Sequence, residues 1–196
     1  MIQTAEGGMS EIAAILARMR ELAVQSANDT LTTTDRTNLN AEYTQLRAEI
    51  TRIADSVQFN SVILLNAAPL FKLQIGANDA AASNQLPIQF SNNQAGSGGL
   101  TLQSTDVTSL ANATAGITQI DAAINTISTN RASLGAMQSR LESAVRSLAV
   151  ASENAAAANS RVADADIAGS MSELVRAQIL QQAGISVLAQ ANQAPG

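Results

Sequence analysis

Cysteine, histidine and tryptophan are absent from this chain of 196 residues, and aromatic residues make up only 2% of it. The first two absences exclude disulfides, thiolate nucleophiles, imidazole bases and the usual transition-metal sites. A lack of cysteine fits either the cytosol or an extracellular protein that never relied on oxidative folding. The core must therefore come from leucine, isoleucine, valine and many alanines, and such small side chains suit long, thin helical bundles.

Strong positive charge is also missing, because the net charge is −5 and Lys72 is the single lysine. No basic patch is present, so nucleic-acid binding is not expected. No apolar run approaches the length of a membrane span, and the N-terminus lacks the charged and apolar regions of a signal peptide. If the protein leaves the cell, it is expected to do so without a cleaved signal peptide.

The region from about 106 to 162 is rich in apolar residues that recur at alternating steps of three and four. This spacing is typical of a helix with a seam that faces partner helices. The expected seam residues are Ile117, Ile120, Ile124, Ile127, Arg131, Leu134, Gln138, Leu141, Val145, Leu148, Ser152, Ala155, Asn159 and Val162. A helix of this length would extend about 80 Å, so it needs partners along its length.

Two shorter helices are predicted near the N-terminus, at about 4–28 and 34–55, with the same three-four spacing. In the first the apolar residues are Met9, Ile12, Leu16, Met19 and Ala23, widened by Ile15 and Leu22. In the second they are Leu39, Tyr43, Leu46, Ile50, Ile53 and Val57. Residues 32–35 offer several N-caps for the second helix.

The pattern changes between 58 and 104, where apolar and polar residues alternate at strand spacing in 71–75 and 86–90. Pro87 within the second run indicates an edge strand. We expect a small antiparallel sheet or a set of hairpins here, and we interpret the glycine-rich 96–99 as a hairpin tip.

A helix break is expected at 163–166, followed by a last helix that is apolar on more than one face. Few charges follow Arg176, so burial against a partner chain is the favoured interpretation and folding back on the bundle is the alternative. The candidate assembly residues are Ile179, Leu180, Ile185, Val187 and Leu188.

No group of residues in the sequence supports catalysis or cofactor binding. Asp164 and Asp166 could hold a hard cation, but helix-capping carboxylates are the favoured interpretation. The acidic residues Glu42, Glu49, Glu142 and Glu153 lie on helical faces that are expected to be solvated. We therefore expect no enzyme activity, no metal and no cofactor.

Four stretches of the chain closely resemble the two ends of bacterial flagellins. They are 18–28 (RMRELAVQSAN), 58–60 (QFN), 133–136 (SLGA) and 176–192 (RAQILQQAGISVLAQAN). The resemblance covers roughly 5–66 and 106–195. It implies a mainly α fold, an elongated antiparallel helical bundle or coiled coil of two N-terminal helices and one long C-terminal helix, with a small β-hairpin region.

On this resemblance the first two helices are the partners of the long helix. The implied domains are 1–57 and 106–163 for the inner rod, 58–105 for a short variable region, and 164–196 for a terminal helix. Flagellins usually begin with a further helical segment and end with a few more hydrophobic residues, so we expect this chain to be a trimmed flagellin with little or no outer domain. Ser61 stands where the family often has glycine.

The resemblance implies a structural subunit of the flagellar filament that polymerises with other flagellin subunits for motility. It also implies a secreted, extracellular location at the flagellum and an export chaperone that binds the C-terminal helix. A hook-filament junction protein, which shares these helical ends, is the alternative. The sequence of 176–182 and the compact middle favour flagellin.

The resemblance also implies recognition by the flagellin-sensing Toll-like receptor of animal hosts, through a surface that includes the segment matching 18–25. By this match the candidate residues are Arg18, Leu22 and Glu42. The alternative is that Arg18 and Glu42 are ordinary solvated helix residues and that Leu22 packs at the edge of the seam.

Overall fold

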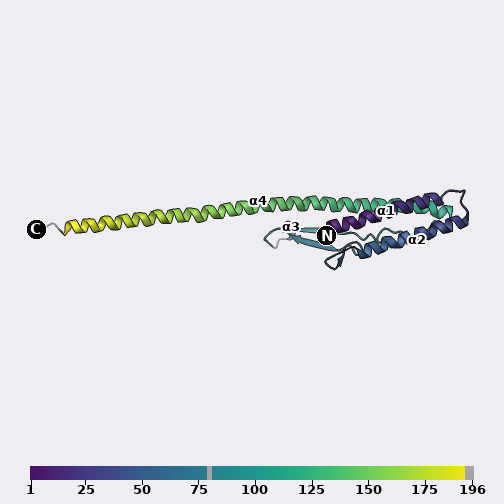
Figure 1. Ribbon diagram of the computed structural model, residues 1–196, viewed down its shortest axis with the longest axis horizontal. Coiled ribbons are helices and arrows are strands. Elements are labelled where there is room, and N and C mark those ends of the chain that lie inside the picture. Colours follow the sequence, from purple (N-terminus) through teal and green to yellow (C-terminus); the bar gives the residue numbers. More distant parts are fainter. Residues whose placement is uncertain (79–80, 193–196) are drawn as a thin grey trace. The chain divides into compact units, whose positions relative to one another are not determined.

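The computed structural model describes residues 1–78 and 81–192, with the backbone alone for 81, 82 and 164–166. Its elements in chain order are α1 (Ile2–Ser26), α2 (Thr33–Ser56), β1 (Gln58–Phe59), β2 (Val62–Ile63), β3 (Leu70–Gln74), α3 (Ala81–Asn84), β4 (Gln85–Gln89) and α4 (Leu110–Ala191) (Figure 1). The chain divides into two compact units, Met1–Ser143 and Ala144–Gly196. The predicted mainly α fold with small antiparallel strand pairs is confirmed.

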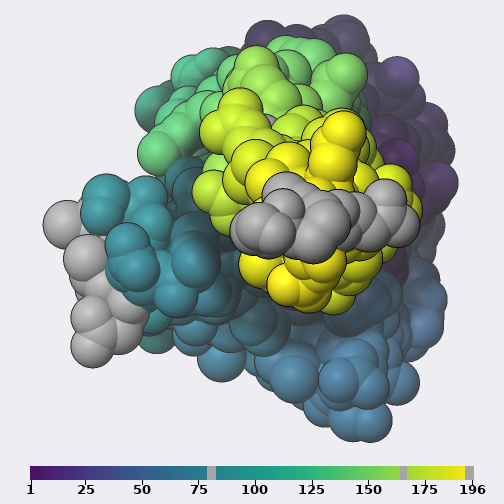
Figure 2. Space-filling model, turned by 90° about the vertical axis from the view of Figure 1, so that its left-hand side faces the viewer, coloured from purple at the N-terminus to yellow at the C-terminus, as the bar shows by residue number. Residues whose placement is uncertain are grey.

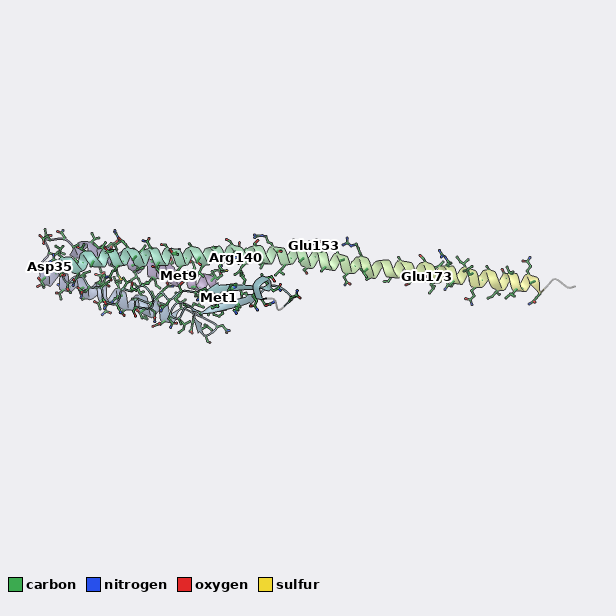
Figure 3. The ribbon with its side chains drawn as sticks, turned by 180° about the vertical axis from the view of Figure 1, so that it is seen from behind. Met1, Met9, Asp35, Arg140, Glu153 and Glu173 are labelled. Carbon is green, nitrogen blue, oxygen red and sulfur yellow. The ribbon has the colours of Figure 1, made fainter. Side chains whose placement is uncertain are left out.

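Helices α1 and α2 form an antiparallel pair joined by a short turn. Arg18 of α1 pairs with Glu42 of α2, and the Ser26 carbonyl near the end of α1 accepts a hydrogen bond from Arg36 near the start of α2. The buried face of α1 has the predicted spacing, and its buried apolar residues are Ala5, Met9, Ile12, Leu16, Met19, Leu22 and Ala23. The interior position of Met9 can be followed in Figure 3.

A capping box starts α2, within the residues 32–35 that are expected to supply an N-cap. The Thr32 hydroxyl accepts a hydrogen bond from the Asp35 backbone N–H at 3.3 Å, and the Asp35 carboxylate accepts one from the Thr32 N–H at 3.0 Å. Two backbone donors that the helix itself leaves without partners are thereby satisfied.

The first part of α4 runs antiparallel to α1 and completes the core of the first unit. Two ion pairs set this direction, Arg20 with Asp121 at 2.7 Å and Glu6 with Arg131 at 2.7 Å. The buried apolar residues that α4 contributes are Ala113, Ile120, Ala123, Ile127 and Leu134, with Ile117, Ile124 and Leu141 packed against them. The predicted seam is thus covered by the same chain from Ile117 to Leu141.

Beyond Leu141 the expectation that the first two helices cover the seam is wrong. Val145 is 65% exposed, Leu148 is 46% exposed and Val162 is 72% exposed. The reason is length, because α1 has 25 residues and α2 has 24. A helix of about 25 residues extends about 37 Å, which matches only about half of the seam from Ile117 to Val162 and less than a third of α4.

The helix break expected at 163–166 is also wrong, since α4 continues through this stretch to Ala191. Alanine at 163, 165 and 168 favours helix, and neither proline nor glycine interrupts 163–168. The two aspartates are tolerated there even though they are weaker helix formers. The side chains of Asp164 and Asp166, named as a possible cation site, lie outside the described residues.

The middle of the chain forms two separate pairs of antiparallel strands. In the β3–β4 pair, Phe71 is opposite Ile88 and Lys72 is opposite Pro87, so Pro87 lies on an edge strand as predicted. Phe71 also meets Phe90 edge to face, with ring centroids 5.8 Å apart. In the β1–β2 pair, Gln58 is opposite Ile63 across a two-residue turn.

The interpretation of 96–99 as a hairpin tip is wrong, because this segment follows β4 as an irregular turn. The turn closes on itself through backbone hydrogen bonds, with Leu100 N donating to the Gln94 carbonyl at 2.7 Å and Leu102 N to the Ala95 carbonyl at 2.9 Å. Leu100 and Leu102 are buried, so the apolar residues after the glycines fill the core and do not form a strand.

Side chains of α1 and α2 hold the segment that leads into α4. Arg47 donates to the carbonyls of Gln103 and Thr105, each at 2.9 Å, and Asn40 accepts from the Val107 N–H at 3.1 Å. The buried Ser26 hydroxyl donates to the Val107 carbonyl at 2.6 Å. These contacts fix where α4 begins relative to α1 and α2.

Candidate functional site

The two charged recognition candidates, Arg18 and Glu42, meet on the surface of the α1–α2 pair. Arg18 Nη2 lies 2.8 Å from Glu42 Oε1, and Arg18 Nη1 lies 3.0 Å from Glu21 Oε2. Hydrogen bonding to Glu42, and then to Glu21, raises the pKa of the Arg18 guanidinium. Half of the Arg18 side chain remains exposed, and 45% of the Glu42 side chain does, so both charges are available to a partner.

Leu22 differs from the other two candidates because only 1% of it is exposed. It lies one turn after Arg18 on α1 but on the face that packs into the core. Its place on the apolar stripe with Met19 and Ala23 already indicates this burial. The structure therefore brings Arg18 and Glu42 together at the surface and places Leu22 inside.

Glu21, which pairs with Arg18, also lines a surface groove that the sequence does not predict. It is lined by Ala17, Arg20, Glu21, Val24, Gln25 and Ile124. Val24, which lines the groove together with Arg20 and Glu21, is 50% exposed. The five residues from α1 are close together in the sequence. Ile124 is about a hundred positions away, and only the packing of α4 on α1 brings it to this groove.

The candidate assembly residues of α4 are all open to solvent in the second unit. Their exposed fractions are 60% for Ile179, 66% for Leu180, 61% for Ile185, 63% for Val187 and 66% for Leu188. The side chains near the end of this helix are yellow in the space-filling view (Figure 2). Residues 177–192 carry no charged side chain.

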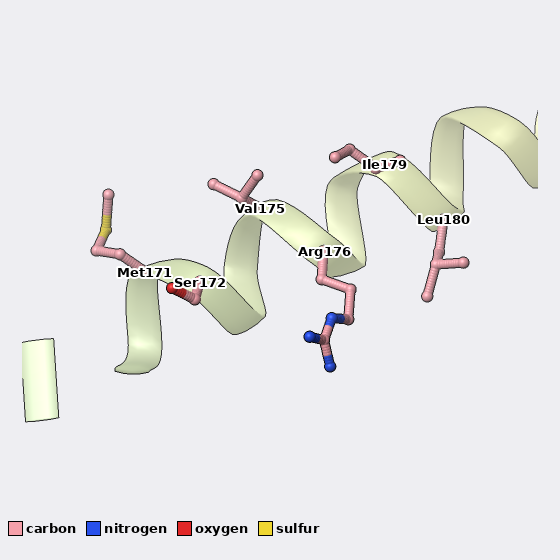
Figure 4. Close-up of a pocket in the computed structure, with 6 residues that line it drawn as sticks. All are labelled: Met171, Ser172, Val175, Arg176, Ile179 and Leu180. Atoms are coloured by element: carbon pink, nitrogen blue, oxygen red, sulfur yellow. The ribbon is translucent and has the colours of Figure 1, made fainter. Parts of the chain in front are cut away.

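The close-up of α4 shows how its apolar side chains are distributed. Met171, Val175 and Ile179 follow one another along one side of the helix, while Arg176 and Leu180 point to another (Figure 4). Because positions four apart lie nearly above one another, each set forms a row. Apolar side chains on more than one side, here the row of Met171, Val175 and Ile179 and the separate Leu180, agree with the pattern of the sequence.

Several of the acidic side chains engage in structural contacts. Glu49 accepts two hydrogen bonds from Arg52, at 2.6 and 2.7 Å, and this contact lowers the pKa of the Glu49 carboxyl. Among the side chains that the structure describes, which exclude those of 164–166, no group of three or more acidic residues is arranged to bind a metal ion. None of the helices in the described part of the chain is both long and apolar enough to cross a membrane.

Comparison with known protein families places both helical ends in one family. The profile of the bacterial flagellin N-terminal helical region matches 1–68, and that of the bacterial flagellin C-terminal helical region matches 117–196. The chain belongs to the bacterial flagellin family. The two matches lie on either side of the segment that contains β3, β4 and the glycine-rich turn.

Relatives in this family are similar over almost the whole chain. The flagellin of Halalkalibacterium halodurans is 43% identical over 196 residues, which are all of this chain and 71% of that flagellin. The flagellar filament 30.7 kDa core protein of Treponema maltophilum is 35% identical over 97% of this chain and 71% of its own length. The crystal structure of Bacillus cereus flagellin superposes with a TM-score of 0.64 at 30% identity, covering 74% of this chain and 82% of that one.

Membership in the flagellin family decides between the functional classes considered for the sequence. Flagellins are structural components of the flagellar filament and not enzymes, so the prediction of a non-enzymatic protein is confirmed by the family. Self-association is likewise a property of the family. The ion pair of Arg18 with Glu42 lies in the N-terminal matched region, and the exposed apolar rows of α4 lie in the C-terminal one.

Proposed function

We propose that this chain polymerises with copies of itself through the exposed apolar faces of α4 and that the resulting filament serves motility. The observation that carries the proposal is the exposure of the apolar residues of α4 after Ala144. They are Val145, Leu148, Val150, Val162, Ile167, Met171, Leu174, Val175, Ile179, Leu180, Ile185, Val187 and Leu188.

Exposure on this scale is unfavourable for an isolated chain. Each large aliphatic side chain gains about 1.5–3 kcal/mol when it is moved fully from water into an apolar contact. A helix that packs against nothing is also only marginally stable, since tertiary contacts supply most helical stability in proteins. Association of several copies would bury the exposed apolar side chains and would also give the helix the tertiary contacts that stabilise it.

In this assembly we assign the segments 1–57 and 106–163 to an inner rod, 58–105 to a short variable region and 164–196 to a terminal helix. A partner that covers the apolar rows before assembly is also expected. We therefore propose an export chaperone that binds α4 around Ile179–Leu188, export without a cleaved signal peptide, and function outside the cell at the flagellum. Co-purification from a flagellated host tests the chaperone proposal. The Leu188→Gln variant is expected to lose the co-purifying chaperone.

Self-assembly in ammonium sulfate tests the main proposal, because sulfate strengthens the burial of apolar surface. Electron microscopy is expected to show long filaments for the unmodified chain. The double variant Leu180→Gln with Leu188→Gln is expected to form none, while the matched variant Gln181→Asn with Gln190→Asn assembles normally. These positions do not touch the core, and chemical denaturation of each variant checks that the core still folds.

The same experiment distinguishes the alternative of a hook-filament junction protein. A junction protein forms a short zone and is not expected to build long filaments alone. Filaments from the leucine variant would contradict the role of the apolar rows. Failure of the unmodified chain to assemble under any salt condition would contradict the filament proposal.

We further propose that the surface around Arg18 and Glu42 is recognised by the flagellin-sensing Toll-like receptor of animal hosts. The support is an exposed ion pair between Arg18, in the segment 18–25 that resembles the recognised part of flagellins, and Glu42 on the second helix. On this proposal Leu22 acts from the core by holding α1 in place and does not touch the receptor.

A charge exchange separates recognition from stability. Arg18→Ala and Glu42→Ala are each expected to weaken signalling in receptor-expressing reporter cells without unfolding the helices. Arg18→Glu combined with Glu42→Arg restores the ion pair but exchanges the two charges, so signalling should stay low. Arg52→Ala, which removes an exposed ion pair elsewhere on α2, is the control. Full signalling by the exchanged variant would show that the pair matters only for structure.

A further inference from the structure

The five methionines of the chain differ sharply in their access to solvent. Met9 is 1% exposed and Met19 is fully buried, whereas Met171 is 57% exposed. Met1 and Met137 lie between these extremes and pack against the core. Oxidation of a methionine depends on access to its sulfur, so this difference has a chemical consequence.

We propose that Met171 is a reversible oxidation site that controls self-association of α4, and the second half of this inference rests on the proposed function. The oxidant is a peroxide. The thioether sulfur of Met171 takes one oxygen atom from the peroxide and becomes a sulfoxide, while the peroxide is reduced to water or an alcohol. The sulfur loses two electrons and the peroxide gains them, so the step is balanced without any other reactant.

The position of Met171 gives this oxidation an effect on assembly. Its side chain lies in one row with Val175 and Ile179 (Figure 4), both of which are also about half exposed or more. Oxidation converts a flexible apolar side chain into a polar one with a strong hydrogen-bond acceptor. Burying that acceptor in an apolar contact without a donor is unfavourable, so the sulfoxide weakens association through this row.

The chemistry also limits when the site is reactive. Before assembly the sulfur of Met171 is open to solvent, and after assembly through the same row it is covered. The inference therefore applies to the free subunit, and the filament is expected to protect Met171. Methionine sulfoxide reductases reduce the sulfoxide with two electrons from thiols, which become a disulfide, while the oxygen atom leaves as water, and the side chain returns to its apolar form.

Dilute hydrogen peroxide and peptide mass mapping test the site itself. Met171 of the unassembled chain is expected to gain one oxygen atom first. Met9 and Met19 should react more slowly by a factor on the order of 10³ or more, because they become accessible only in the small unfolded population. Oxidation of Met1 or Met137 at the same rate as Met171, or faster, would overturn the inference.

Competition during assembly tests whether oxidation of Met171 weakens self-association. Oxidised and unmodified chains, distinguished by isotope label, are mixed in ammonium sulfate, and the oxidised chain is expected to be depleted from the filaments. Treatment of the oxidised chain with methionine sulfoxide reductases should restore its incorporation into filaments. Met171→Leu keeps the apolar row but has no sulfur, so peroxide should leave its assembly unchanged, whereas the control Met137→Leu should remain sensitive.

Equal incorporation of the oxidised chain would overturn the proposed control of assembly, as would a Met171→Leu chain that is still inhibited by peroxide. If the unmodified chain forms no filaments, the proposed filament function fails. The oxidation map then decides the remaining inference by itself, because it is measured on the free chain.

Discussion

At the scale of single residues, the turn between β1 and β2 holds two residues with left-handed backbone angles. Asn60 has φ 50° and Ser61 has φ 63°. Residues with a Cβ pay roughly 1–2 kcal/mol for this conformation, although asparagine is more tolerant of it than serine. Ser61 is therefore a source of local strain in an exposed turn.

We predict that Ser61→Gly raises the free energy of unfolding by about 0.5 kcal/mol, the relief of strain being partly offset by the greater freedom of glycine in the unfolded chain. Urea denaturation measures the change. Ser128→Gly, on the exposed face of α4, is the matched control and should lower stability by about 0.5 kcal/mol. A lower stability for Ser61→Gly would contradict the strain.

Asp106 gives the segment before α4 a dependence on pH. Its carboxylate accepts hydrogen bonds from the Thr108 hydroxyl at 2.6 Å, the Asn112 side chain at 2.8 Å and the Thr108 N–H at 3.0 Å. These bonds, the Thr108 hydroxyl first, lower the pKa of Asp106 in the folded state. Since the folded pKa is below the unfolded value, the stabilisation is present above about pH 3.9 and is lost as the pH falls through the folded pKa.

We therefore predict that Asp106→Asn lowers stability at neutral pH, and that its difference from the unmodified chain shrinks as the solution is acidified below the unfolded pKa. Thermal unfolding followed across this pH range measures the difference. A difference that stays constant on acidification would show that the charge of Asp106 contributes nothing.

At the scale of elements, the start of α2 depends on a local motif that the sequence displays openly. The Thr32 side chain caps the helix and Asp35 completes the box. We predict that Thr32→Ala lowers the free energy of unfolding by about 1 kcal/mol, whereas Thr33→Ala, one position inside the helix, changes it little. Chemical denaturation of the two variants in parallel checks this, and equal effects would contradict the cap.

The connection into α4 depends on a contact that joins distant parts of the chain. Arg47 donates to two backbone carbonyls at 2.9 Å and is within 3.5 Å of that of Leu102. Hydrogen bonds from a charged group contribute about 1.5–3 kcal/mol, so Arg47→Met should lower stability by about 2 kcal/mol. Arg52→Met, which removes only an exposed pair within one helix, should cost less than about 0.5 kcal/mol. Similar losses of stability for the two variants would contradict the role of Arg47 in holding the segment before α4.

At the scale of the whole molecule, the two units of the chain differ in how their backbone is supported. In Met1–Ser143 the helices share one core, whereas the apolar side chains after Ala144 are exposed. Helices that lack tertiary contacts open readily, and helices in a core open only with it.

Hydrogen exchange should reveal this difference. We predict slow exchange for the amides of α4 between Ala113 and Leu141 in the unassembled chain, and fast exchange for those between Val145 and Leu188. After assembly the second group should become protected. Fast exchange of the second group in the filament as well would show that another surface forms the contacts between subunits.

The candidate site was predictable in part. The resemblance to flagellins directs attention to Arg18 and Glu42, but the distance between them does not follow from the sequence. Leu22 is a candidate by the same resemblance, although its side chain is buried. A motif identifies positions that go together without saying which of them reach the surface. Which side chains reach the surface depends on how each helix is rotated about its axis. The ion pairs of Arg18, Arg20 and Arg131 with neighbouring helices reflect this rotation.

Features that depend only on neighbours along the chain follow from the sequence alone. The three-four spacing, the capping residues at Thr32 and Asp35 and the strand alternation around Pro87 act over one or two turns, so they predict helices, a cap and a hairpin correctly. Tertiary structure decided how far the seam is covered, that 163–166 remains helical, and that the residues after the glycine-rich turn fill the core. These outcomes depend on which segments meet in space, and local spacing along α4 is the same where partners exist and where they do not.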